Sequence, residues 1–476
     1  MKAEKEIVVG ALLHDIGKVV QRAQTNSKRR EKHTKLGANW LSKTGIKLRD
    51  YSEYSLYHHA EEVENTENKL IHYVALADNF SAFERPQRGE DVWERNQPLR
   101  NIFDLIDFEH PSDSKSLQTF WPLSILETDS EGYIIPVFPS SEVPETLHES
   151  YTKILENLGK YFKDNPEIVD DPDKLLLLLE KYLSFVPSET NIGENVPPDI
   201  SLYDHLKTTA MIAVCMRRYI YDEKPSDIGL HSSYSELKNF FDARNVEAFL
   251  LVHGDISGVQ KFIYTITSKG ALRSLRARSF YLQILQERVV ERILEELHLY
   301  RVNIHYIGGG NFYLILPNTQ RIIETLEKVS TEFNNFLQNE GLDLHLIIDW
   351  IPFGAREFEN MKRIFEEASK KVNIKKLHPY STEQLKEFFS ITKADKETCK
   401  ICGKRTDQLY TVGDSDEKIA CKFCWNMYNL GSKLPKAEFL YPVEKPKPTD
   451  IKIFDRYYSI VTKLDTNKNS GFALKY

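Results

Sequence analysis

A histidine–aspartate pair interrupts the first long apolar stretch of the chain. The stretch runs from Ile7 to Val20 and predicts a helix buried on most sides, with His14 and Asp15 in its middle. Burying such a pair is costly unless partners compensate for it. Mixed nitrogen and oxygen ligands suit a transition metal, so the pair predicts that neighbouring helices add ligands to a divalent ion. A hydrogen-bonded core histidine is the alternative.

Further histidine and aspartate residues follow soon after this pair. His58 and His59 come after an aromatic stretch that predicts a second helix. We expect one of the two to be a ligand, because neighbours on a helix do not share a face. Asp78 ends the apolar stretch 70–77, which predicts a third helix. These residues are the first candidates to complete the metal site.

Two more histidines and one lysine are open to two interpretations. His33 follows a basic run and suits either a ligand or a solvated loop, whereas His72 is predicted to be structural. A metal here can generate hydroxide near neutral pH and hold a phosphate. Lys18 would stabilise the charge that develops on that phosphate, although a solvated helix residue fits equally well. The region therefore predicts a metal-dependent phosphohydrolase with His14, Asp15 and Lys18 as catalytic residues.

This pattern resembles the HD phosphohydrolase superfamily, whose all-helical domains hold one or two metal ions with histidine and aspartate ligands. In that superfamily another histidine normally precedes the His-Asp helix, and the residues before His14 contain none. A candidate, His205, stands much later in the segment from Ser201 to Ala210. A circular permutation would explain this order and makes His205 a ligand candidate. A buried helix histidine is the alternative.

Length and composition limit the remaining choices. A chain of 476 residues with 41% hydrophobic residues predicts two to four ordinary domains. The N-terminus is charged and its apolar run is interrupted, which argues against a signal peptide. No apolar run is long enough to span a membrane, so we expect a cytoplasmic protein. The net charge of −7 means that any contact with nucleic acid must be local.

Four of the five cysteines form two Cys-x-x-Cys pairs. This spacing is typical of a zinc ribbon, in which two turns each offer two thiolates to a tetrahedral ion. The zinc is predicted to be structural, because four thiolates leave no open position. Disulfide bonds are the alternative, which the absence of a secretory signal disfavours. The zinc ligands are then Cys399, Cys402, Cys421 and Cys424, while Cys215 is predicted to be a buried apolar residue.

An α/β unit lies between the two candidate metal sites. Its predicted elements are a strand at 248–253, a helix of roughly 20 residues from about Phe280, strands at 303–307 and 312–316, a helix at 321–338 and a strand at 343–350. This order is the ferredoxin-like arrangement. Polymerase and nucleotide-cyclase palms share it, and in those palms carboxylates hold two metals.

The hairpin of this palm lacks the expected carboxylates. Its turn reads Gly308-Gly309-Gly310-Asn311, and Asp255 would be the single carboxylate of the first strand. We therefore expect no two-metal chemistry from this domain alone. Glycines can still let a phosphate or base approach the backbone, although a turn chosen only for its shape is the alternative.

The segment after the first strand carries a local surplus of positive charge. Residues 256–286 contain five basic residues and no acidic one, which suits a triphosphate or a nucleic-acid backbone better than a merely solvated face. The candidates for nucleotide binding are Asp255, Ser257, Lys261, Arg276, Arg278, Gly308, Gly309, Gly310 and Asn311.

Taken in order, these motifs resemble the large subunit of type III CRISPR effector complexes, of the Csm (III-A) kind. The resemblance rests on the His-Asp domain, the Ser201–Ala210 motif, Gly-Asp-Ile-Ser-Gly-Val-Gln-Lys-Phe-Ile at 254–263, Leu-Arg-Ala-Arg-Ser-Phe-Tyr-Leu at 275–282 and the four-cysteine ribbon. It implies a permuted HD domain that cleaves single-stranded DNA once target RNA is bound. It also implies two palms that together convert ATP to cyclic oligoadenylates.

The motif Gly-Gly-Asp-Asp, which in that family belongs to the second palm, is absent from the sequence. The stretch 452–460 is predicted to be the opening strand of such a second palm, so we expect a shortened chain or half of a split protein. Cyclic oligoadenylate synthesis is therefore not expected from this chain alone.

The predicted fold class is multidomain α+β, with an all-helical permuted HD domain, a ferredoxin-like palm and a four-cysteine zinc ribbon. The predicted boundaries are 1–110 for the HD core, 111–225 for its helical continuation with the permuted helix at 201–216, 226–390 for the palm, 391–432 for the ribbon and 433–476 for the start of a second palm. The alternatives to a nuclease are an HD phosphohydrolase acting on small nucleotides and a non-catalytic scaffold.

The same resemblance implies cofactors and partners. Manganese or nickel is expected at the HD site, zinc at the ribbon, and ATP only together with a complete second palm. The expected partners are the other Csm-type subunits and crRNA, with single-stranded DNA as substrate and target RNA as activator.

Overall fold

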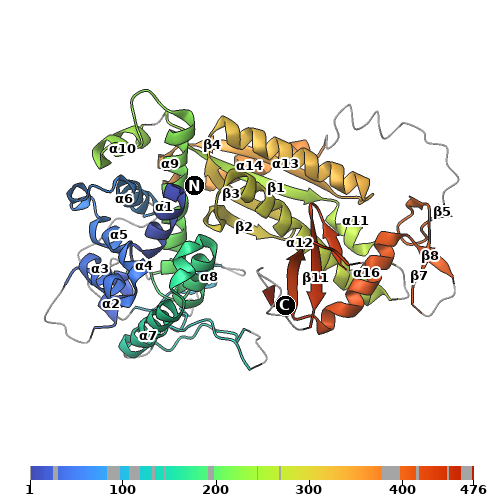
Figure 1. Ribbon diagram of the computed structural model, residues 1–476, viewed down its shortest axis with the longest axis horizontal. Helices are drawn as coiled ribbons and strands as arrows, with labels where there is room; N and C mark the ends of the chain where they lie inside the picture. The colour runs from blue at the N-terminus through green and yellow to red at the C-terminus, as the bar shows by residue number, and fades with distance from the viewer. Residues whose placement is uncertain are drawn as a thin grey trace, which may run out of the picture.

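The computed structural model describes residues 2–24, 31–82, 97–106, 118–130, 134–143, 146–190, 198–243, 245–266, 270–377, 397–413, 417–447, 450–462 and 474–475. Figure 1 shows three parts in sequence: N-terminal helices, a central sheet with its helices, and a small C-terminal part around α16. No described helix has both the length and the apolar character needed to cross a membrane.

The N-terminal part is helical, as predicted. Its helices are α1 (Lys2–Leu13), α2 (Gly17–Arg22), α3 (His33–Thr44), α4 (Ile46–Arg49), α5 (Ser52–Tyr57), α6 (Lys69–Ser81), α7 (His148–Asp164), α8 (Pro172–Leu183), α9 (Leu202–Glu223) and α10 (Tyr234–Phe241), with short 3₁₀ turns at Val63–Asn65, Ile102–Leu105 and Pro166–Asp170. Although α9 comes late in the chain, it packs against α1 and α6. The permuted helix predicted at 201–216 therefore lies beside the segment that carries His14 and Asp15.

The first helix is shorter than the apolar pattern predicts. One continuous helix from Ile7 to Val20 is wrong, because α1 ends at Leu13 and α2 begins at Gly17. The break follows from close packing of α2 on α3. A Cβ on Gly17 would lie 1.9 Å from the carbonyl oxygen of His33 and 2.8 Å from the amide nitrogen of Gly37. His14 and Asp15 consequently stand in a turn between two helices.

The central part is the predicted ferredoxin-like palm. Its elements are β1 (Phe249–Ser257), α11 (Val259–Tyr264), α12 (Ala271–Leu297), a 3₁₀ turn (Arg301–Asn303), β2 (Ile304–Gly308), β3 (Asn311–Pro317), α13 (Gln320–Asn339), β4 (His345–Phe353), a 3₁₀ turn (Ala355–Glu359) and α14 (Lys362–Lys375). The antiparallel sheet has the order β2-β3-β1-β4. Helix α12 begins earlier than the predicted Phe280, because the arginines in its first turns obscure the apolar pattern.

The C-terminal part combines short hairpins, one helix and a second sheet. The elements are β5 (Glu397–Thr398), β6 (Arg405–Thr406), β7 (Tyr410–Thr411), β8 (Lys418–Ala420), α16 (Lys422–Lys433), a 3₁₀ turn (Leu434–Lys436), β9 (Phe439–Val443), β10 (Ile451–Ile453), β11 (Arg456–Val461) and β12 (Leu474–Lys475). Strand β9 pairs antiparallel with β11.

The stretch 452–460 is a hairpin and not the single strand predicted for it. Strands β10 and β11 turn at Phe454, whose φ of 56° is left-handed. Phe454 packs against Phe333 and Phe336 of the palm. Arg288 of α12, whose side chain is 1% exposed, pairs through Nε with Oδ1 of Asp455 at 2.7 Å. This contact fixes the hairpin on the palm and explains the turn.

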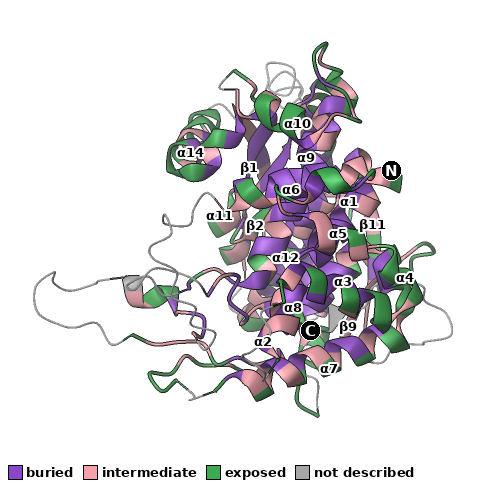
Figure 2. Ribbon diagram, turned by 90° about the vertical axis from the view of Figure 1, so that its left-hand side faces the viewer, coloured by how far each residue is buried: buried purple, intermediate pink, exposed green. Residues whose placement is uncertain are grey.

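Helix α9 joins the helical part to the palm. Cys215 is fully buried, as predicted, and its thiol lies 3.6 Å from the carbonyl oxygen of Ile315 in β3. Asn303 donates to the same carbonyl at 2.9 Å. One continuous core runs through both parts, and Figure 2 shows buried residues along α6, α9 and α12. The first turn of α9 is therefore held by packing along the rest of the helix.

Asp173 of α8 also contacts the palm, and its raised pKa leads to a testable prediction. It accepts a hydrogen bond from the Arg301 amide at 2.7 Å, yet burial raises its pKa from 3.8 to about 6. Because the pKa is higher in the folded chain than in the unfolded chain, the proton stabilises the fold at low pH. That stabilisation is lost as pH rises from the unfolded value through the folded one.

We expect Asp173→Asn to raise the midpoint of thermal unfolding by about 2 °C at pH 7.5, because the amide keeps the acceptor without the buried charge. The gain should shrink towards zero near pH 4. Thermal unfolding of both proteins across this range measures it, and an equal gain at both ends would contradict the raised pKa.

Candidate metal centre

Asp15 lies at the centre of a cluster of buried imidazoles and carboxylates. Its Oδ2 is 3.6 Å from His14 Nε2 and 3.3 Å from His205 Nε2. The same two ring nitrogens lie 3.6 Å and 3.0 Å from Oδ1 of Asp78. One ligand atom from each of these four residues falls within 4.8 Å of all the others. The predicted ligands from three separate helical segments are thus brought together.

A second group lies on the other side of the Asp15 carboxylate. Its Oδ1 is 3.2 Å from His33 Nε2 and 3.5 Å from His58 Nε2. His59 Nε2 is 3.2 Å from His33 Nε2, and one nitrogen of each of these three histidines lies within 4.8 Å of the others. His33, which the sequence left open, begins α3 and faces the cluster because α2 packs closely on α3.

His58 and His59 do not lie on the helix predicted for them, because α5 ends at Tyr57 and His58 is its C-cap residue. The expectation that only one of the two faces the site, which depends on that helix, therefore loses its basis. Neighbouring side chains outside a helix can point the same way, and the two rings lie 4.4 Å apart. His72 is buried on α6 and belongs to neither group in the described part of the chain.

Backbone and hydroxyl groups orient the histidine rings. Nδ1–H of His14 donates to the Ala11 carbonyl at 2.6 Å, and Nδ1–H of His58 donates to the Ser55 carbonyl at 2.9 Å. Nδ1 of His205 lies 3.2 Å from Ser81 Oγ, whose own proton goes to the Asp78 carbonyl. In neutral rings these contacts place the proton on Nδ1 and leave Nε2, which faces the carboxylates, available to bind a metal, as in metal-binding histidines.

The chemistry of the cluster fits a cation. In the part of the chain that the structure describes, Nε2 of His14 and of His58 and Oδ1 of Asp15 are buried and form no hydrogen bond. An unprotonated ring nitrogen and a carboxylate oxygen that lie 3.0–3.6 Å apart repel each other unless a positive ion lies between them. The donor set of imidazoles and carboxylates matches a transition metal such as manganese, nickel, iron or zinc.

Charge states in the cluster favour metal binding near neutral pH. Burial by itself would raise the pKa of Asp15, but the Lys18 ammonium, followed by His14, holds it well below its usual range. Burial likewise opposes the effect of His14 and His205, which hold the pKa of Asp78 low. Burial lowers the pKa of His33, and burial together with His58 lowers that of His59 to about 4. Ionised carboxylates and neutral imidazoles are the forms that bind metal.

Lys18 reaches the same centre. Its ammonium is 2.6 Å from Oδ2 of Asp15, and its side chain is 11% exposed. It is therefore not the freely solvated residue that the sequence allowed. A cation in this position can also approach a phosphate bound beside Asp15.

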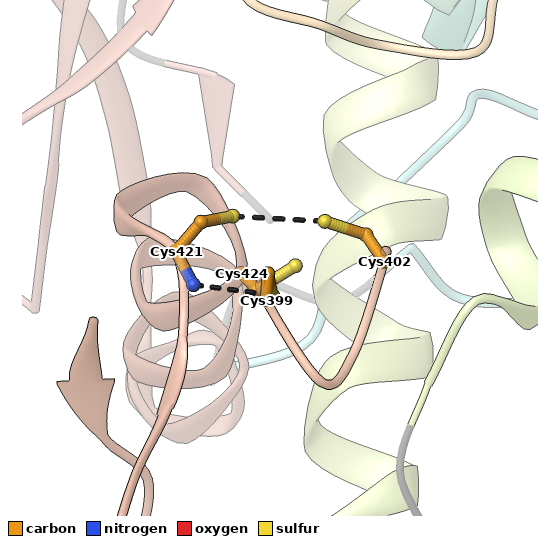
Figure 3. Close-up of side chains that lie close together, drawn as sticks. All are labelled: Cys399, Cys402, Cys421 and Cys424. Carbon is orange, nitrogen blue, oxygen red and sulfur yellow. Dashed lines mark hydrogen bonds between the residues drawn. The ribbon is translucent and has the colours of Figure 1, made fainter. Parts of the chain in front are cut away.

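The four predicted zinc ligands form a second cluster. One sulfur from each of Cys399, Cys402, Cys421 and Cys424 lies within 4.8 Å of the others. Figure 3 shows them meeting from a turn on one side and the start of α16 on the other. Cys421 caps α16, and its amide donates to the Cys399 sulfur at 3.2 Å. The spacing predicted this convergence, and the four thiols fit a tetrahedral ion.

The palm candidates meet at one end of the sheet. Asp255 pairs in register with Asn311, next to the turn formed by Gly309 and Gly310 at φ 61° and 90°. Ser257 donates to Asp255 at 2.8 Å, and Lys376, which the sequence analysis missed, pairs with Asp255 at 2.9 Å. Binding of a nucleotide by this end stays a prediction.

The basic candidates are engaged within the chain. Lys261 is mostly exposed and pairs with Asp343 at 2.7 Å. Arg276 donates to the Gly431 carbonyl at 3.3 Å. Arg278 is only 3% exposed and donates to the Phe262 carbonyl at 2.9 Å. The contacts of the two arginines favour a structural role over phosphate binding.

Known proteins resemble the chain over nearly its whole length. The HD domain family matches residues 2–82, and the family described as Csm1 subunit domain B matches residues 248–393. Relatives named CRISPR system single-strand-specific deoxyribonuclease Cas10/Csm1 (subtype III-A) occur in Streptococcus thermophilus and Enterococcus italicus. They are 31% and 30% identical, and each match covers 92% of this chain and 58% of the relative.

Solved structures agree with the sequence matches. A Csm1-Csm4 cassette in complex with one ATP has a TM-score of 0.67 and 25% identity, covering 96% of this chain and 55% of that one. Csm1 of T. onnurineus has a TM-score of 0.58 and 29% identity, covering 81% and 50%. The chain spans a little over half the length of the curated relatives it matches. Together with the helical His-Asp domain and the palm, these matches support a Csm-type large subunit with an HD domain at its N-terminus, over the part of the relatives' length that the chain spans.

Proposed function

We propose that the chain is a metal-dependent nuclease that cleaves single-stranded DNA at the cluster around Asp15. The observation that supports this most is the set of buried ligand atoms on His14, Asp15 and His58 that form no hydrogen bond within the described residues. A decayed scaffold would have no reason to keep such costly groups. The names of the curated relatives suggest the substrate class.

In this proposal the histidines and aspartates hold metal ions, and the Lys18 ammonium supplies a further positive charge. A bound transition metal would supply a hydroxide near neutral pH and polarise a phosphate oxygen. His14, Asp78 and His205 would hold an ion on one side of Asp15, and His33, His58 and His59 an ion on the other, so we expect about two ions per chain. Lys18 would stabilise the charge that grows on the attacked phosphate.

Cleavage of end-labelled single-stranded DNA by the full chain with Mn²⁺ or Ni²⁺ tests the proposal. We expect cleavage by the wild type and by His72→Ala, because His72 is a buried histidine outside both ligand groups. The double variant His14→Ala/Asp15→Ala should be inactive. Turnover of dNTPs without cleavage of oligonucleotides would instead support the nucleotide phosphohydrolase.

We also propose that the four-cysteine cluster holds structural zinc and that the palm contributes to ATP binding in a longer or assembled protein. Asp255 is paired with Lys376 and Ser257, and the hairpin has no carboxylate of its own. Synthesis of cyclic oligoadenylates would therefore need carboxylates from another domain.

As partners we propose the other Csm-type subunits, among them a Csm4-type protein as in the similar solved complexes. crRNA and an activating target RNA would complete the assembly. Such an assembly would act in the cytoplasm.

A further inference from the structure

The arginines at the start of α12 contact the ribbon helix α16. The Arg273 guanidinium lies 5.4 Å from the centre of the Tyr428 ring and donates to its hydroxyl at 2.9 Å. The helices approach so closely that a Cβ on Gly431 would lie 1.9 Å from the Arg273 carbonyl oxygen. The arginines at the start of α12 therefore serve mainly to dock the ribbon on the palm.

Arg278 differs from its neighbours because it also reaches the cysteine cluster. Its Nη2 lies 3.4 Å from the Cys424 sulfur, and its Nη1 donates to the Phe262 carbonyl at 2.9 Å. The guanidinium lies 5.0 Å from the centre of the Phe262 ring and 5.7 Å from that of Phe423. One buried cation therefore joins the ribbon cysteines to the end of α11.

A buried guanidinium is costly unless a negative group compensates for it. Four thiolates around a divalent ion carry two net negative charges, and a positive donor beside one sulfur lowers the cost of gathering them. Arg278 and the metal-loaded cluster would then stabilise each other. The guanidinium also fills the space between two aromatic rings, where its charge is attracted to the ring faces.

We propose that Arg278 is a positioning residue of the ribbon metal site, which holds the Cys424 thiolate and makes the palm depend on ribbon metal. The proposal rests on the zinc assignment made above. Helix α11 directly follows the segment that carries Asp255 and Ser257. Further along α12, Gln286 accepts from the Gly310 amide at 3.2 Å and so holds the hairpin turn. Metal in the ribbon thereby fixes the end of the sheet where the palm candidates converge.

Zinc retention by the full chain tests this proposal. Zinc released to a colorimetric chelator is measured at increasing EDTA concentration for the wild type, Arg278→Ala, Arg278→Lys and Arg273→Ala. Arg273→Ala is the matched control, because it removes an arginine of the same helix that contacts α16 but no cysteine. Hydrogen exchange of the α11 amides is followed in the same samples.

We expect Arg278→Ala to release zinc at roughly tenfold lower EDTA concentration, as is typical when a residue that orients a metal ligand is lost. Arg278→Lys should be intermediate, since an ammonium cannot donate in two directions with the same geometry. Arg273→Ala should match the wild type. Exchange in α11 should accelerate in Arg278→Ala and in the chelated wild type alike.

Equal zinc retention by wild type and Arg278→Lys, with Arg278→Ala either equal or unfolded, would overturn the proposal. A wild type that contains no zinc would overturn the zinc assignment as well, so the two failures are distinguishable. Unchanged exchange in α11 after chelation would refute the dependence of the palm on ribbon metal.

Discussion

Asp15→Asn is expected to lower cleavage of single-stranded DNA by on the order of 10³-fold or more. The carboxylate faces both histidine groups, with Oδ1 near His33 and His58 and Oδ2 near His14 and His205. An amide removes the charge that offsets the bound cations and offers one oxygen in place of two. Initial rates with saturating Mn²⁺ measure the effect.

Asp170→Asn is the control for this change. Asp170 is a half-exposed aspartate of the same domain that forms exposed ion pairs with Lys5, at 3.4 Å, and with Lys47, and it lies outside the cluster. Its substitution removes the same charge and should leave the rate within about twofold, because an exposed ion pair contributes little. Similar losses in both variants would show that net charge, and not the cluster, governs cleavage.

Gly17→Ala is expected to destabilise the HD domain by about 3 kcal/mol and to weaken metal binding together with it. The added methyl group would meet the His33 carbonyl oxygen at 1.9 Å and the Gly37 amide nitrogen at 2.8 Å, and both are backbone atoms that cannot turn aside. Moving α3 to relieve the contact would displace the His33 ring from Asp15. Thermal unfolding and Mn²⁺ titration of the variant measure the two effects.

Gly45→Ala is the matched control for Gly17→Ala. Its backbone is extended, and the nearest atom to an added Cβ is Leu48 Cδ1 at 3.8 Å. We expect a change in stability within about 0.5 kcal/mol. If Gly17→Ala were equally harmless, the close approach of α2 and α3 would not be what positions His33.

Much of the site was predictable because polar residues that can bind a metal interrupt apolar patterns. His14 and Asp15 interrupt a buried stretch, and a polar pair there needs partners. His205 stood out because a known pattern lacked a histidine at its usual place. The four cysteines were predictable from spacing alone, since a Cys-x-x-Cys turn presents two sulfurs on one side.

The remaining features depend on contacts between distant segments, which periodicity does not contain. The turn at His14 and Asp15 arises where Gly17 meets the backbone of α3. His58 and His59 share a direction because α5 ends before them. The basic charge of Arg278 indicated an anion, but its partner is the sulfur of Cys424, far along the chain. The charge of a side chain predicts the sign of its partner's charge but not which residue the partner is.

Metal content after dialysis against Mn²⁺ tests the central claim most directly. Elemental analysis compares the wild type with His14→Ala/Asp15→Ala, with ribbon zinc counted separately in each protein. We predict about two manganese ions per wild-type chain, none in the double variant and equal zinc in both. Equal manganese in the two proteins, or none in the wild type, would contradict the assignment of the Asp15 cluster as a metal centre.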